Sequence, residues 1–301
     1  MTTSTSAITL KTAFGQYATL AALRDGRVSV PGVQFDHVQV QPDIVAAFRR
    51  MCRTLEFDVS EMAVVTYFVA RHYGLPMTAI PVVLSASVHD GRGIVYNQNA
   101  GVRTPKDLEG KRVGVRAYTV TGGVWARAYL AEQGVDLSKV TWVLGDDEHV
   151  AEFHKDAPPN LEYRVGADLA KMLADGELAG GIQIAPGGPI KEFFPDAQAT
   201  GIETFRRTGI YRLSHLVVTK DAVLAENPWL ARALYDAFKA SKEEWLRTLD
   251  APPAPNEDRM LIGLSATRKS FEALMNSAVA QGILPRPLDL EQALSIHLVQ
   301  S

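Results

Sequence analysis

Two titratable residues stand beside apolar runs that are typical of strands. Glu61 lies in the segment DVSEMAVV, and His215 lies in RTGIYRLSHLVV just before the apolar LVV. A carboxylic acid or an imidazole in such a place can move a proton when burial and neighbouring charge tune it. The structural alternatives are that Glu61 stabilises a helix N-terminus and that His215 is a hydrogen-bonded core residue. We take Glu61 and His215 as the candidate acid and base.

Two further polar residues precede Glu61 at the predicted turn between a strand over 57–61 and the next helix. We expect Asp58 and Ser60 to cluster with Glu61 at one edge of a sheet and to contact a bound ligand. The alternative is that Ser60 caps the helix and that Asp58 only shapes the turn.

A Thr/Gly-rich loop follows the predicted strand 111–115 and opens a helix. Free backbone N–H groups and the positive end of the helix dipole make such a corner an anion site, since open α/β sheets bind ligands at this edge. Capping of the helix by the threonines is the alternative. The candidate ligand contacts in this loop are Arg116, Tyr118, Thr119 and Thr121.

Four more residues are candidate substrate contacts. His89 and Arg92 precede the predicted strand 93–97, and Arg207 and Tyr211 share the segment of His215. Arginine and tyrosine can hold a second carboxylate. Each has an alternative, a mobile loop for the first two residues and a surface ion pair for the last two.

The sequence predicts neither a metal site nor a cofactor. His149, Glu152 and His154 lie close together, but their spacing matches known ligand sets weakly and favours a solvated turn. The single Cys52 has no partner for a disulfide within the chain and no CxxC neighbour.

Composition excludes several kinds of partner. The 301 residues are 47% hydrophobic, enough for two lobes with a core each. The 31 basic and 34 acidic residues nearly balance, and no segment has the basic density that nucleic acid or an anionic membrane requires. We therefore expect a small molecule as partner, while assembly into a homo-oligomer is left open.

The beginning of the chain carries no basic segment followed by an apolar core, as a secretory signal would. No apolar run has the length of a membrane span. We expect a cytoplasmic protein.

Short apolar strands alternate with helical patterns, which is typical of βαβ units. After His215 the pattern becomes mostly helical, over 228–249 and 257–281, with the proline-rich APPAPN between the two. The predicted strands are 8–14, 33–40, 57–61, 78–85, 93–97, 111–115, 140–144 and 180–185, and the other predicted helices are 17–24, 43–53 and 166–175.

Four segments carry a family resemblance. DLEGKRVGV (107–115) resembles the type II periplasmic-binding-protein fold of nitrate-, sulfonate- and thiamine-precursor-binding proteins. EFDVSEMAVVTY (56–67), YTVTGGVWARAYL (118–130) and RRTGIYRLSHLVV (206–218) resemble segments of the 4,5-dihydroxyphthalate decarboxylases. The similarity extends from about Thr12 to Leu249 and is weakest in the C-terminal helices.

The resemblance implies a two-lobed α/β protein with a ligand cleft between the lobes and a helical C-terminal segment. Lobe one would comprise 1–92 and 212–301, and lobe two 93–211. Tyr118 to Thr121 and an arginine would then hold a retained carboxylate.

The same resemblance implies cofactor-independent decarboxylation of a dihydroxylated aromatic dicarboxylate, 4,5-dihydroxyphthalate or a close analogue. Glu61 or His215 would protonate the ring at the carboxylate-bearing carbon while the other polarises a phenol. The alternative is a non-catalytic binding protein for a small aromatic acid or oxyanion, although the export signal of such proteins is not evident. A thiamine-precursor synthase ranks behind both, since its histidine- and cysteine-rich iron segment is not seen.

Overall fold

The computed structural model describes residues 7–300. The expectation about the beginning of the chain therefore falls partly on residues 1–6, which lie outside the described residues. The chain forms two compact units. Unit 1 contains residues up to Ser87, Leu213–Arg268 and residues from Leu288, and unit 2 contains Val88–Arg212 and Lys269–Pro287. The last of these segments was assigned to lobe one in the sequence prediction.

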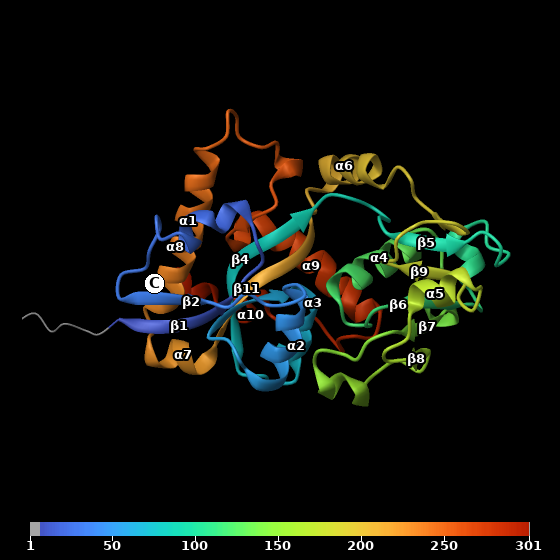
Figure 1. Ribbon diagram of the computed structural model, residues 1–301, viewed down its shortest axis with the longest axis horizontal. Helices are drawn as coiled ribbons and strands as arrows, with labels where there is room; N and C mark the ends of the chain where they lie inside the picture. Colours follow the sequence, from blue (N-terminus) through green and yellow to red (C-terminus); the bar gives the residue numbers. More distant parts are fainter. Residues whose placement is uncertain (1–6, 301) are drawn as a thin grey trace, which may run out of the picture. The chain divides into compact units, whose positions relative to one another are not determined.

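Unit 1 is built on a six-stranded sheet in which strands distant in sequence lie side by side (Figure 1). The parallel strands β1, β2 and β3 direct their carboxyl ends to the same edge. The later strand β11 runs antiparallel to β3, with His215 opposite Ala63. In sheet order the strands are β12 (Leu261–Ile262), β4 (Met77–Ser87), β11 (Arg212–Lys220), β3 (Val59–Ala63), β1 (Ile8–Ala13) and β2 (Val33–His37).

Helices cover this sheet and bury an apolar core. Leu234 and Phe238 of the long helix α8 pack with Leu10, Val59 and Val217 of the strands. Removing this apolar surface from water is the main stabilising term for unit 1. The helices are η1 (Ala18–Leu20), α1 (Ala21–Arg24), α2 (Val45–Thr54), α3 (Val64–His72), α7 (Asp221–Glu226), α8 (Leu230–Leu246), α10 (Leu290–Ala293) and α11 (Ile296–Gln300).

Unit 2 has its own six-stranded sheet, with a core that includes Val95, Val143 and Leu173. Its order is β10 (Ile190–Glu192), β5 (Ile94–Asn97), β9 (Gly180–Ile182), β6 (Arg112–Val115), β7 (Thr141–Leu144) and β8 (Leu161–Tyr163) (Figure 1). Its helices include α4 (Thr121–Glu132), α5 (Leu169–Ala174), α6 (Ala197–Thr208) and most of α9 (Leu264–Ala280).

A buried ion pair joins the two ends of the long segment of unit 2. Nε of Arg212 donates to Oδ1 of Asp90 at 3.0 Å, and its Nη2 contacts the same oxygen. The Asp90 side chain is 2% exposed, and the guanidinium lies 4.6 Å from the centre of the Trp125 ring. The first and last residues of this segment, Val88–Arg212, are thus held near each other by the ion pair between Asp90 and Arg212.

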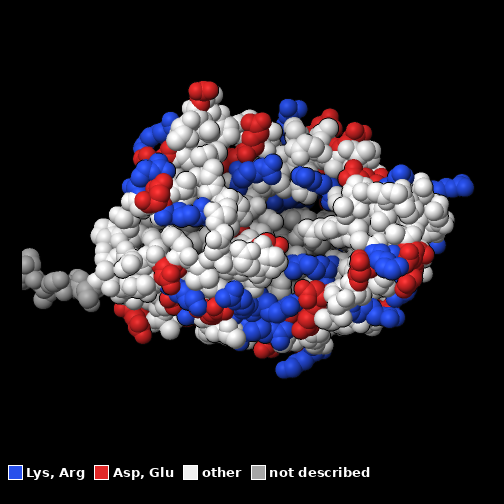
Figure 2. Space-filling view, in the orientation of Figure 1, with Lys and Arg blue, Asp and Glu red and all other residues white. Residues whose placement is uncertain are grey.

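The predicted alternation of strands and helices is confirmed, and one predicted helix is wrong at its start. The expected helix 257–281 begins only at Leu264, because Pro255–Glu257 form a 3-10 turn and β12 follows it. Gly263, with φ +85°, reverses the chain before α9. Among residues 7–300, no helix combines the length and the apolar character that crossing a bilayer requires. Acidic and basic side chains both occur across the face shown in Figure 2.

Candidate active site

The side chain of Glu61 lies in the middle of β3 and is completely buried in unit 1. A buried carboxylate requires donors that replace its lost water. Three donors meet it: the Gly15 N–H contacts Oε2 at 2.8 Å, while the Tyr17 hydroxyl at 2.6 Å and Nδ1 of His215 at 2.5 Å contact Oε1. Donors from two separate stretches of chain, the loop after β1 and strand β11, therefore converge on this carboxylate.

His215 is held from two sides. Its Nδ1 faces Glu61, and its ring packs edge-on against Phe48 of α2, with centroids 4.9 Å apart. A carboxylate only accepts hydrogen bonds, so Nδ1 carries the proton of the neutral imidazole, and Nε2 is the nitrogen that a second proton converts into the donor of the imidazolium. The side chain remains 19% exposed, against 0% for Glu61. Of the pair, His215 is the residue that a ligand can reach.

The loop after β1 fixes the carboxylate from the other side. A Cβ on Gly15 would lie 2.9 Å from the Tyr17 ring and 3.2 Å from Oε2 of Glu61, so a side chain there would displace one of these groups. Nη2 of Arg24 in α1 donates to the Gly15 carbonyl at 2.7 Å. This loop also lines a cavity of about 350 Å³ whose other wall is the segment 39–44.

The Tyr17 hydroxyl is a permanent donor. Burial and the adjacent negative charge of Glu61 raise the pKa of this phenol far above its ordinary value, and a contact with Ser85 opposes them weakly. The phenol therefore keeps its proton throughout the neutral and mildly alkaline range.

Asp58 and Ser60 do not join this group. Asp58 precedes β3, where its carboxylate accepts from the Lys11 N–H at 2.8 Å and pairs with Lys220 at 2.8 Å. The Ser60 hydroxyl donates to the backbone carbonyl of Glu61 at 2.9 Å. Asp58 and Ser60 thus have partners other than the Glu61 carboxylate, and as ligand contacts both stay predictions. The capping alternative is wrong, since Ala63 is the N-cap of α3.

In unit 2, the predicted anion corner is filled by the protein itself. The fully buried Glu148 accepts from the N–H groups of Tyr118 at 2.6 Å and Thr119 at 3.1 Å, and from the Thr119 hydroxyl at 2.5 Å. The corner therefore has backbone N–H donors, as the sequence predicts, and the carboxylate of Glu148 is the anion that they bind. Thr121 is the first residue of α4 and is buried, and no side chain caps this helix.

A second buried charge supports this corner. Arg127 of α4 is fully buried beneath the Tyr118 ring, 3.9 Å from its centre, and donates to Gln281 and to the Tyr118 carbonyl. Burial lowers the pKa of this guanidinium, and the nearby Tyr118 and Glu148 oppose the shift. The corner is thus a packed polar core.

The remaining predicted contacts lie elsewhere in unit 2. Arg116 pairs with Asp146 at 3.8 Å, and the Tyr211 N–H donates to Ser270 at 2.9 Å. Arg92 and Arg207 are exposed, whereas the backbone of His89 packs against Gly201. As ligand contacts these five residues stay predictions. In the expected solvated turn, His154 binds Asp147 at 2.7 Å, and His149 is buried. Within residues 7–300, no group of three or more His, Cys, Asp or Glu side chains is arranged to hold a metal ion.

Sequence reasoning missed Gly15, Tyr17 and Arg24 in unit 1 and Glu148 in unit 2. The signal for the first two was available, because FGQY follows the first strand at its carboxyl end, where ligands of open sheets bind. No local pattern marks Arg24 or Glu148, since their partners lie in other segments.

Comparison with known families identifies the chain. The model of a family described as NMT1/THI5 like matches residues 54–248, which include both Glu61 and His215. The chain belongs to this NMT1/THI5-like family. Among curated proteins, it is 31% identical over 254 residues to a 4,5-dihydroxyphthalate decarboxylase of Comamonas testosteroni, covering 79% of this chain and 76% of that one. It is 32% identical over 184 residues to the enzyme of the same name from Pseudomonas putida, covering 57% and 68%.

Solved structures agree on the fold. The alkanesulfonate-binding protein SsuA of Xanthomonas axonopodis pv. citri, bound to MOPS, superposes with a TM-score of 0.56 at 12% identity. The match covers 97% of this chain and 98% of that one. The NMT1/THI5-like chain thus has the α/β fold of the type II periplasmic binding proteins, with a helical C-terminal segment, as expected from its sequence.

Proposed function

We propose that this chain is a carboxy-lyase that decarboxylates 4,5-dihydroxyphthalate, or a close analogue, to protocatechuate or the corresponding product. The observation that carries the proposal is the contact between Glu61 and His215, which orients a partly exposed imidazole through its Nδ1. The similarity to two curated 4,5-dihydroxyphthalate decarboxylases supports the choice of substrate. Protein groups supply the proton in this scheme, and no cofactor takes part.

The reaction begins with protonation of the ring carbon that bears the departing carboxylate. The imidazolium of His215 gives its Nε2 proton to this carbon while the hydroxyl para to it donates electron density to the ring. The bond between the ring and the carboxylate then breaks, its electron pair restores aromaticity, and carbon dioxide leaves. Solvent returns a proton to Nε2, so each turnover consumes one proton.

Glu61 acts in this scheme as a positioning residue. Its carboxylate is completely buried and already accepts from three protein donors, so it does not reach a ring carbon. It holds Nδ1 and compensates the positive charge of the imidazolium. His215 is then the catalytic residue that meets the substrate.

An open volume lies beside the loop that holds Glu61, and His215 is not one of its lining residues. The cavity of about 350 Å³ beside Gly15 and Tyr17 falls in the range of small-molecule sites. Because those two residues also hold Glu61, a ligand there would contact the loop that positions the acid–base pair.

The experiment is turnover in heavy water. Purified protein is incubated with 4,5-dihydroxyphthalate in deuterium oxide, and released carbon dioxide and protocatechuate are quantified, with and without a metal chelator. We expect one deuterium in the product at the carbon that lost the carboxylate. Product without deuterium at that carbon would contradict ring protonation. Loss of turnover in the presence of the chelator would contradict a mechanism in which protein side chains act without a metal.

The alternative function is a non-catalytic binding protein for a small aromatic acid or oxyanion, and the SsuA-like fold favours it. It predicts a calorimetric titration of 4,5-dihydroxyphthalate with no release of carbon dioxide. Turnover at a rate that depends on His215 would exclude this alternative.

A further inference from the structure

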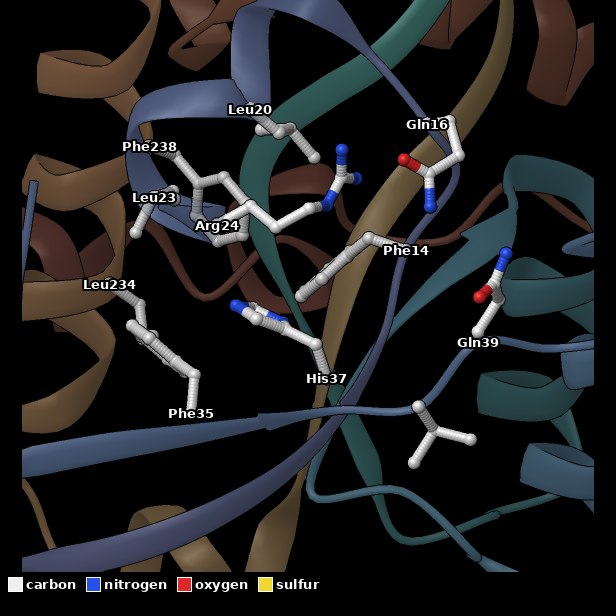
Figure 3. A pocket seen from close by; sticks show the side chains of 11 residues that line it. Phe14, Gln16, Leu20, Leu23, Arg24, Phe35, His37, Gln39, Leu234 and Phe238 are labelled. Atoms are coloured by element: carbon white, nitrogen blue, oxygen red, sulfur yellow. The ribbon is translucent and has the colours of Figure 1, made fainter. Parts of the chain in front are cut away.

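A second hollow in unit 1 adjoins the 350 Å³ cavity and shares Phe14, Gln16 and Gln39 with it. It lies between the loop after β1, the η1–α1 helices, β2 and α8, and has a volume of about 170 Å³ (Figure 3). Neither Glu61 nor His215 lines it. An apolar cavity of about 150 Å³ is known to hold one benzene molecule, so a single six-membered ring fits here.

The walls are aromatic. Phe14 and Phe238 meet edge to face with centroids 5.4 Å apart, and Phe35 stacks with His37 at 5.6 Å. Phe14 and Phe35 remain only partly buried, so part of their ring surface borders the hollow (Figure 3). Partly exposed aromatic side chains around a concave site favour a flat apolar ligand.

The polar side of the hollow is cationic. The guanidinium of Arg24 lies among the lining side chains in Figure 3, and none of the eleven lining residues is acidic. Within residues 7–300, Arg24 has no carboxylate at ion-pair distance, and its hydrogen bond goes to the Gly15 carbonyl. Desolvation and the charge of Arg24 lower the pKa of His37, which keeps that ring neutral near pH 7. The Arg24 guanidinium is thus a positive charge that has no paired carboxylate among the described residues.

We propose that this hollow binds a small aromatic monocarboxylate, with its single ring among Phe14, Phe35 and Phe238 and its carboxylate on Arg24. The guanidinium fork suits a carboxylate in two-point contact. The hollow is too small for two rings, and its aromatic walls disfavour inorganic phosphate.

Occupancy of this site is linked to the acid–base pair. Arg24 donates to the Gly15 carbonyl at 2.7 Å, and the Gly15 N–H donates to Glu61 at 2.8 Å. A bound carboxylate competes with Gly15 for the guanidinium and so loosens the loop that holds Glu61. This effect on turnover rests on the proposed function: benzoate then lowers kcat.

Binding itself is tested without turnover, by calorimetric titration with benzoate. We expect one site per chain, and at least about tenfold weaker binding in Arg24→Gln, because a charged hydrogen bond is worth roughly 1.5–3 kcal/mol. Arg27→Gln is the matched control, since Arg27 binds Asp25 on the surface and does not line the hollow. It and His215→Asn should stay within about twofold of the parent.

Two results would overturn the proposal. One is the absence of benzoate binding at millimolar concentration, and the other is binding that weakens in His215→Asn but not in Arg24→Gln. If Arg24→Gln does not fold, Val38→Trp replaces it, because Val38 is a partly exposed residue that lines this hollow and not the 350 Å³ cavity, so its enlargement should block the hollow and abolish binding. Benzoate binding in a protein that lacks decarboxylase activity would leave this inference intact while refuting the proposed function.

Discussion

Nδ1 of His215 lies 2.5 Å from Oε1 of Glu61, a contact between residues 154 positions apart in the chain. The antiparallel pairing of β11 with β3 creates it, since His215 lies opposite Ala63, and Val217 opposite Glu61. One residue of this pair is fully buried and the other is not, and that asymmetry separates the positioning role from the catalytic one.

Replacement of the two residues should therefore give different kinetics. His215→Asn removes the proton donor, and we expect kcat to fall by at least about 100-fold with little change in substrate affinity. Glu61→Gln should also lower kcat, and in addition cost roughly 1–3 kcal/mol of unfolding free energy, because a buried amide cannot accept from all three donors. Steady-state kinetics and urea unfolding measure both effects.

His72→Asn is the control for the histidine, because His72 is exposed at the end of α3. It should retain the parent rate. Equal rates in His215→Asn and the parent would remove His215 from the mechanism.

Gly15→Ala should impair turnover through crowding. The added methyl would lie 2.9 Å from the Tyr17 ring and 3.2 Å from Glu61, so the loop or one of these two side chains must shift. We expect kcat to drop by about tenfold or more, as for other small displacements of positioning groups. Gly187→Ala is the matched control, since its methyl would meet no atom within 4 Å. Similar kinetics in the two variants would show that the packing of Gly15 is irrelevant to the reaction.

Alkaline pH should reveal the Tyr17 hydrogen bond. Its pKa is raised in the folded protein, so above the ordinary tyrosine pKa of about 10 the unfolded chain loses a proton that the native state keeps. Stability from this group is present below pH 10 and declines as the pH rises further. Unfolding free energies of the parent and Tyr17→Phe, measured from about pH 8 to 11, should differ most at the lower end and converge towards the upper end. A difference that is constant with pH would rule out this linkage.

Glu148→Gln tests whether the corner in unit 2 is structural. Because three donors are directed at the carboxylate, we expect a loss of roughly 1–3 kcal/mol of stability, with KM for the substrate nearly unchanged. Glu132→Gln, on the exposed side of α4, should change neither quantity. A large increase in KM without destabilisation would instead indicate that the corner contacts the ligand.

Asp90→Asn should destabilise the protein more than a surface substitution does. Breaking a buried ion pair by removing one partner costs about 3–5 kcal/mol, because the other charge stays buried. Thermal unfolding followed by tryptophan fluorescence is a direct probe, since Arg212 stacks on Trp125. Asp175→Asn, which removes an exposed pair with Lys171, should shift the midpoint only slightly. Equal shifts in both variants would contradict the role assigned to Asp90.

The sequence by itself determined the α/β alternation, most strand positions and the two residues that meet at the candidate site. These features are local: the periodicity of apolar residues specifies strands and helices, and a polar residue inside an apolar run indicates a special environment. Glu61 was identifiable for that reason, whereas the functional role of His215 was implied by the family resemblance.

Only the tertiary structure decided what each charge does. Asp58 and Glu61 are three positions apart in one segment, yet one pairs with Lys220 and the other with His215. The backbone N–H groups of Tyr118 and Thr119 act as donors, as the sequence predicts for this corner. The anion that they bind is the carboxylate of Glu148, about 30 positions away in the chain. The physical reason is that charge pairing and burial are set by neighbours from other strands, and the pattern within one segment does not encode those neighbours.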